Sequence, residues 1–160
     1  MEDLERDRKT LNQLGLQMQA IVADTTPLNY LVVIEVVDIL PRVYGRVLVP
    51  PAVKAELSDP KTPVMVSRWI AQSPSWVYVV PLRTPADSSL LHLDAGEREA
   101  IALASGQQNS LLLMDKRDGT TAARSRGIAV IGTLAVLDQA AVRGWIDLPK
   151  VFNRLRQTTF

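Results

Sequence analysis

Short apolar runs alternate with longer amphipathic segments along most of the chain. Five of the runs have the length and residue types of buried strands: 20–23, 46–49, 76–80, 111–114 and 128–131. Each is followed at once by an acid, a proline or a glycine. Strands that alternate with helices form βαβ units, so the pattern predicts a three-layer α/β/α domain with a mostly parallel central sheet.

The segments between these runs carry helix-start signals. Thr26 is predicted to cap a helix that continues to residue 33, and Asp118 a helix over 119–126. Asp94, with Glu97 three residues later, has the spacing of a capping box at the start of the clearest helix, which Gly106 ends. The remaining predicted helices are 35–43, 52–57, 64–72, 133–142 and 149–156.

Residues 1–19 are polar and are predicted to form an arm or a helix outside the core, before a domain over 20–160. The first ten residues are too charged for a signal peptide. The most apolar stretch, Leu28 to Leu40, is interrupted by Glu35 and Asp38 and so predicts no membrane span. A cytoplasmic protein is therefore expected.

Composition narrows the chemistry further. Among 160 residues there are 17 Asp and Glu, one His and no Cys, which excludes disulfides, thiolate metal sites and cysteine nucleophiles. Carboxylates are thus the expected working groups. From residue 116 to the end, eight basic residues stand against three acids, which predicts a modest anion-attracting face.

Four acids are placed where they can work together. Asp24 and Asp115 each follow a predicted strand, and ligands of parallel sheets bind beyond the carboxyl ends of the strands. Glu97 lies in the first turn of a predicted helix, and Glu56 lies in the short helix after the second strand. Clustered carboxylates need a compensating cation, and oxygen ligands favour Mg²⁺ or Mn²⁺, which promote hydrolysis of phosphodiesters.

Each acid also has a simpler interpretation. Asp24 and Asp115 fit turns, Glu97 fits the capping box, and Glu56 taken by its spacing alone fits a solvated helix surface. Glu99 lies about 200° round the helix from Glu97 and is expected to face solvent.

Five segments together resemble one family. They are 21–28 (IVADTTPL), 49–57 (VPPAVKAEL), 93–104 (LDAGEREAIALA), 111–115 (LLLMD) and 132–137 (GTLAVL). In this order they resemble the acidic motifs of PIN-domain ribonucleases, the last segment resembling a PIN-like subfamily. The resemblance covers about residues 20–145, and four acidic motifs in order are more specific than any one of them.

The resemblance implies a Mg²⁺- or Mn²⁺-dependent endoribonuclease, often the VapC-type toxin of a toxin–antitoxin pair. By motif, Asp24, Glu97 and Asp115 would bind the metal and Glu56 would support the site. Hydrolysis would leave a 5′-phosphate on one fragment.

The resemblance also implies contacts with RNA and with proteins. Thr25 or Thr26 supplies the small polar residue that follows the first acid, and Lys116 and Arg117 are placed to hold the RNA backbone. A cognate antitoxin would insert a segment, often with an arginine, into the acidic pocket. A homodimer is expected, and Leu28–Leu40 offers either a dimer surface or core.

The chain departs from the family pattern at two motifs. The third acid is usually Asp, whereas here it is Glu97, or Glu99 if the motif is shifted. The fourth motif often reads Thr-x-Asp, which makes Asp118 a reserve candidate for Asp115. These departures keep open a PIN-fold module that binds RNA or protein without cutting. A phosphotransferase of the haloacid-dehalogenase type would need an acid at Thr26 and is the least favoured hypothesis.

Overall fold

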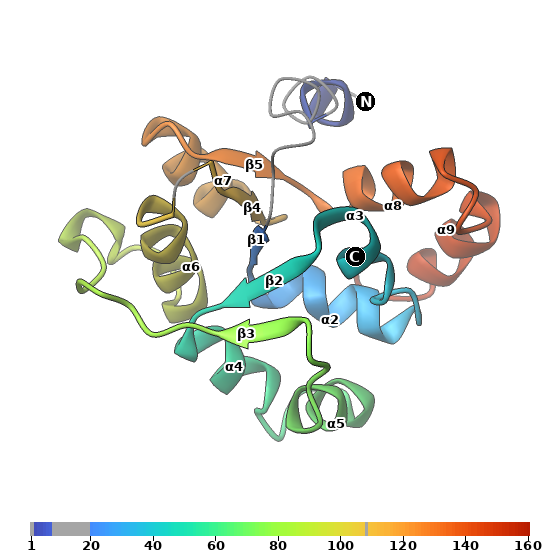
Figure 1. The fold of residues 1–160 in the computed structure, drawn as a ribbon, viewed down its shortest axis with the longest axis horizontal. Helices are drawn as coiled ribbons and strands as arrows, with labels where there is room; N and C mark the ends of the chain where they lie inside the picture. Colours follow the sequence, from blue (N-terminus) through green and yellow to red (C-terminus); the bar gives the residue numbers. More distant parts are fainter. Residues whose placement is uncertain (1, 8–19, 108) are drawn as a thin grey trace.

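A computed structural model describes residues 2–7, 20–107 and 109–160. Within these residues, five strands form one parallel sheet in the order β3-β2-β1-β4-β5 (Figure 1). The strands are β1 (Ala20–Ala23), β2 (Arg46–Val49), β3 (Val77–Val79), β4 (Leu111–Leu113) and β5 (Ala129–Ile131). All five predicted strands are confirmed, and their observed ends differ from the predicted ones by one residue at most.

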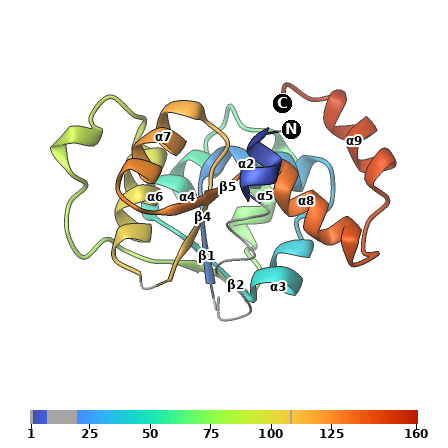
Figure 2. The ribbon, with the colours of Figure 1, turned by 90° about the horizontal axis from the view of Figure 1, so that it is seen from above.

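Helices cover both faces of the sheet, which confirms the three-layer prediction. They are α2 (Thr25–Val33), α3 (Ile39–Tyr44), α4 (Pro51–Leu57), α5 (Val64–Ala71), the 3₁₀ helix η2 (Ser88–Leu90), α6 (Ala95–Ser105), α7 (Arg117–Ser125), α8 (Thr133–Val142) and α9 (Leu148–Arg156). Figure 2 shows α6 and α7 on one side of the sheet and α3, α8 and α9 on the other.

The core lies in two layers because successive strand residues point to opposite faces. In β1, Ile21 and Ala23 pack into one layer with α2, α4 and α8, whereas Val22 packs into the other with α6 and α7. This explains why the strands are apolar throughout. Most apolar residues of Leu28–Leu40 are buried in the first layer, so core packing accounts for this stretch and leaves little of it for a dimer surface.

The predicted helix over 35–43 is shorter than expected and begins only at Ile39. Glu35 has a φ of +63°, the left-handed conformation that commonly follows a helix C-terminus. It separates α2 from α3. Residues of this conformation are usually Gly or Asn, so the sequence carried no signal for the break.

The N-terminal prediction was wrong in part. Residues 2–7 are helical, but Asp7 is buried rather than outside the core. Its carboxylate accepts hydrogen bonds from the Gly132 backbone N–H at 2.9 Å and from Arg124 at 3.2 Å. Residues 8–19 of the predicted arm lie outside the described residues.

The strand order reverses between β1 and β4, and this topological switch point positions the candidate site. In open parallel sheets, ligands bind at such a point, beyond the carboxyl ends of the strands. Asp24 follows β1, and Asp115 comes two residues after β4. The Asp24 backbone N–H donates to the Leu113 carbonyl at 3.0 Å and extends the pairing to the edge of the site. Across the described part of the chain, no helix has the length and apolar character needed to cross a membrane.

Candidate metal centre

Asp24 is the most buried acid at this edge. It is 1% exposed, and neither carboxylate oxygen has a hydrogen-bond partner within the described residues. Burial raises the pKa of Asp24 from 3.8 to about 7; the nearby Thr25 backbone N–H opposes this rise, and the charges of Asp94, Glu97 and Glu56 increase it. A carboxylate in this setting is costly unless a proton or a cation neutralises it.

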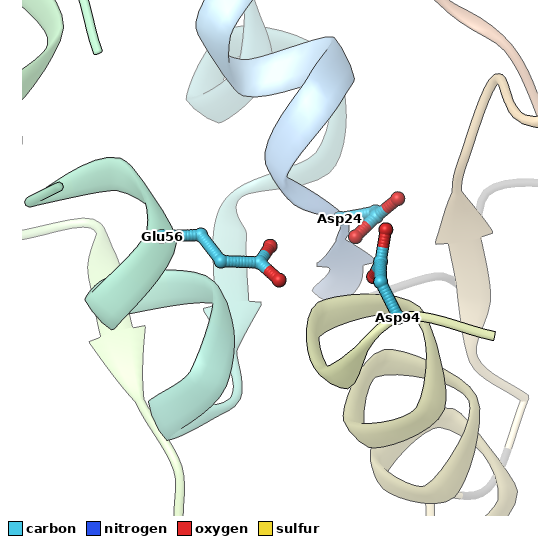
Figure 3. A group of neighbouring side chains, drawn as sticks. All are labelled: Asp24, Glu56 and Asp94. Carbon is cyan, nitrogen blue, oxygen red and sulfur yellow. The ribbon is translucent and has the colours of Figure 1, made fainter. Parts of the chain in front are cut away.

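Glu56 extends from α4 toward Asp24 (Figure 3). Its Oε1 accepts a hydrogen bond from the Gly96 backbone N–H at 3.0 Å, and its Oε2 accepts one from the Thr25 hydroxyl. A Cβ at position 96 would collide with this carboxylate and displace it, so glycine lets the first turn of α6 approach Glu56 in its observed position. Glu56 is thus fixed between α2 and α6 rather than solvated.

Asp94 and Glu97 form the predicted capping box at the start of α6. Asp94 Oδ1 accepts from the Glu97 backbone N–H at 2.8 Å, and Glu97 Oε2 accepts from the Asp94 backbone N–H at 3.0 Å. The second oxygen of Asp94 accepts from Lys116 Nζ at 2.5 Å. Partial burial raises the pKa of Asp94, but the bonds from Lys116 and Glu97 outweigh it and lower the pKa overall. Burial raises the pKa of Glu97.

Three carboxylates converge here, and we call Asp24, Glu56 and Asp94 the acidic cluster. Each offers an oxygen that lies within 4.8 Å of those of the other two (Figure 3). They come from the end of β1, from α4 and from the residue that caps α6. Three carboxylate donors, one of them buried and unpartnered within the described residues, suit a hard divalent cation. Sequence reasoning missed Asp94 as a candidate ligand because the capping pattern already explained it.

Asp115 lies at the same edge, but its oxygens have other partners. Thr133 donates its backbone N–H to Oδ1 at 2.8 Å and its hydroxyl to Oδ2 at 2.5 Å. Burial raises the pKa of Asp115, and the bonds from Thr133 oppose the rise. Asp7 stands beside it, held by Gly132 and Arg124. Asp115 therefore fastens β4 to the start of α8 in this arrangement.

The predicted RNA-binding residues divide into two groups. Thr25 bonds Glu56, and Lys116 bonds Asp94, so both belong to the acidic site itself. The hydrogen bond to Asp94 is the main cause that raises the pKa of Lys116. The negative charges of Glu97 and Asp24 raise this pKa further. The side chains of Thr26 and Arg117 have no hydrogen bond or ion pair within the described residues; Arg117 is exposed at the start of α7.

Three local predictions need correction. Glu99 does not face solvent freely: its carboxylate accepts a hydrogen bond from the Ala52 backbone N–H at 3.0 Å and joins α6 to α4. Asp118 does not cap α7, because that helix begins at Arg117, two residues before the predicted start, and Asp118 lies exposed in its first turn. Thr26 does not cap α2, which begins at Thr25 directly after Asp24.

The comparison with protein families agrees with this geometry. A family model described as a PIN domain matches residues 20–160. The chain belongs to the PIN-domain family. No curated protein and no solved structure matches it. PIN domains are generally metal-dependent nucleases, and the acidic cluster of this PIN domain fits that chemistry.

Proposed function

We propose that this PIN domain is a metal-dependent endoribonuclease and that its acidic cluster holds Mg²⁺ or Mn²⁺. The observation that carries the proposal is Asp24: a buried carboxylate whose two oxygens have no partner in the described part of the chain, next to oxygens of Glu56 and Asp94. A divalent cation bound there would supply positive charge that stabilises the charge developing on the phosphodiester oxygens.

The residues around the cluster have distinct roles in this proposal. Asp24 and Asp94 contribute cation ligands, and the Gly96 N–H and the Thr25 hydroxyl orient Glu56 toward them. Glu97 positions Asp94 through the capping box. The assignment of Glu97 and Asp115 as direct ligands, implied by the family motifs, stays a competing prediction. Arg117, exposed on α7, is placed to meet the RNA backbone.

Cleavage of single-stranded RNA with added Mg²⁺ or Mn²⁺ tests the proposal. We expect cleavage that EDTA abolishes, fragments that carry a 5′-phosphate, and no cleavage by Asp24→Asn. Arg68→Gln, an exposed change on α5 away from the cluster, is the matched control and should cleave like the natural chain. Cleavage that survives in Asp24→Asn or in EDTA would contradict the proposal.

The family resemblance supports a finer role as the toxin of a toxin–antitoxin pair. An antitoxin segment carrying an arginine would place a guanidinium against the acidic cluster, where planar carboxylate pairing is favourable. Co-expression with the product of a small adjacent gene should relieve any growth arrest that the domain causes alone. Growth arrest that Asp24→Asn still causes would separate toxicity from catalysis.

The Lys116–Asp94 pair favours a second candidate, a PIN-fold module that binds RNA without cutting it. An ammonium group already neutralises one of the cluster's carboxylates, as a cation would. Calorimetric titration with Mn²⁺ distinguishes the two: the nuclease binds the ion at the cluster, whereas the module binds RNA equally well with and without it.

A homodimer, which the family resemblance implies, is tested by the mass of the protein in solution.

A further inference from the structure

An open hollow of about 390 Å³, lined mostly by residues with polar side chains, lies directly beside the acidic cluster. Thr25 and Glu56 form its boundary with the cluster. One wall is a face of α2 made of Thr26, Asn29 and Tyr30, residues three and four apart that share one side of a helix. The other wall comes from the segment between α4 and α5. The helices α2, α4 and α5 all contact one another (Figure 1). Its volume is in the range of roughly 300–1,000 Å³ typical of small-molecule sites.

The α4–α5 segment presents a cation to this hollow. The Lys61 backbone N–H donates to Asp59 Oδ1 at 2.8 Å, and the Thr62 hydroxyl donates to the carbonyls of Asp59 and Glu56. These bonds fix the backbone on both sides of Lys61. Its ammonium group is exposed and has no hydrogen bond or ion pair among the described residues, so it is available to an anionic ligand.

Asn29 leaves a polar atom unused in the same wall. Its side-chain oxygen is buried and has no hydrogen-bond partner within the described part of the chain. The amide nitrogen of the same side chain also has no hydrogen-bond partner among the described residues and is not enclosed, so it is the group that a ligand in the hollow can reach. The edge of a nucleobase carries the donors and acceptors that an amide recognises in single-stranded RNA.

Tyr30 is held at the rim by the end of the chain. Its hydroxyl lies 3.0 Å from the Thr159 hydroxyl, and its ring meets Phe160 edge-on with centroids 5.0 Å apart. These contacts fix a half-buried aromatic ring beside Asn29. Aromatic rings provide the surfaces on which proteins stack single-stranded bases.

We propose that this hollow is a nucleotide subsite that selects the base next to the cleaved phosphodiester. Asn29 reads the base edge, Tyr30 contacts the base, and Lys61 pairs with the neighbouring phosphate. The inference rests on the proposed ribonuclease function, because the hollow gains its role from its position beside the acidic cluster.

Cleavage of four short RNAs that differ in one base next to the cut tests the subsite. We expect the natural chain to prefer one base in kcat/KM by roughly tenfold, the worth of one hydrogen bond to a buried partner. Asn29→Ala should cleave all four RNAs at similar rates. Lys61→Gln should raise KM several-fold for every base without changing kcat, and Lys54→Gln, an exposed lysine of α4 outside the hollow, should do neither.

Binding of the same RNAs in EDTA, followed by fluorescence anisotropy, separates this inference from the proposed function. The natural chain could bind one base preferentially, lose this preference in Asn29→Ala, and yet never cleave RNA. That result would support the subsite and contradict the nuclease. Cleavage by all variants with an unaltered base preference would overturn the subsite alone. The Asn29 side chain makes no hydrogen bond with the described residues, so the melting temperature of Asn29→Ala should equal or exceed that of the natural chain. A melting temperature that is not lowered excludes misfolding as the cause.

Discussion

Two groups of carboxylates lie at the same edge of the sheet and differ in what surrounds them. The acidic cluster around Asp24 contains a buried acid whose oxygens have no partners among the described residues. At Asp115 and Asp7, every carboxylate oxygen accepts a hydrogen bond, from Thr133, Gly132 or Arg124. We call this second group the satisfied pair.

The difference separates Asp115 and Asp7, whose oxygens hold the fold together, from Asp24, whose oxygens are available to a ligand. Hydrogen bonds to a charged acceptor stabilise a fold, so the satisfied pair contributes stability on its own. Asp24 costs stability until a cation arrives, because burial without partners among the described residues penalises its negative charge. Asp24 and Asp115 both follow a parallel strand. They differ in the number of hydrogen-bond partners that their carboxylate oxygens have among the described residues.

The largest expected effect is on pH-dependent stability. The folded pKa of Asp24, about 7, exceeds its ordinary 3.8, so the folded state holds the proton more tightly. In EDTA, this contribution to stability is therefore full below pH 4 and is lost as the pH rises through 7, by about 4 kcal/mol at most. Asp24→Asn should remove it and leave the variant more stable than the natural chain at pH 8.

Urea denaturation from pH 4 to pH 8 measures this effect. Asp7, Glu97 and Asp115 have raised pKa values as well, so only the difference between the natural chain and Asp24→Asn isolates Asp24. If the free energy of unfolding changed with pH in the same way for the two proteins, Asp24 would have an ordinary pKa. This would contradict the difference drawn between Asp24 and the satisfied pair.

The next largest expected effect is a loss of folding stability when the satisfied pair loses a hydrogen bond. Thr133 is fully buried, and its hydroxyl donates to Asp115. Thr133→Val should lower the free energy of unfolding by about 2 kcal/mol, because a buried acceptor loses its partner. Thr133→Ser keeps the hydroxyl and should lose clearly less. Equal losses for Val and Ser would assign the effect to packing rather than to the hydrogen bond.

The smallest expected effect is on Mn²⁺ affinity and concerns Lys116, whose ammonium group already pairs with Asp94 of the acidic cluster. Lys116→Gln should tighten Mn²⁺ binding about fivefold, since the pair with Asp94 is partly exposed and such pairs are worth about 1 kcal/mol at most. Arg117→Gln, which removes the neighbouring exposed charge, is the control and should change the affinity less. Weaker binding in Lys116→Gln would mean that Lys116 supports the ion rather than competing with it.

The sequence predicts the features that depend on local pattern. The strands, and the placement of Asp24 and Asp115 at their ends, follow from apolar runs and their breaks. The partners of these acids do not, because Thr133 is 18 residues from Asp115, and Glu56 is 40 residues from Gly96. Asp94 shows the same limit: its cap is visible in the spacing, but its nearness to Asp24 depends on how α6 packs beside β1.

Mn²⁺ titration by calorimetry, on the natural chain, Asp94→Asn and Asp115→Asn, tests the central claim most directly. Asparagine caps a helix as well as aspartate does, so Asp94→Asn should keep α6 intact. The account predicts that Asp94→Asn loses most of its Mn²⁺ affinity, whereas Asp115→Asn, if folded by circular dichroism, retains it. Loss of binding in Asp115→Asn with full binding in Asp94→Asn would contradict the account and place the ion at the satisfied pair.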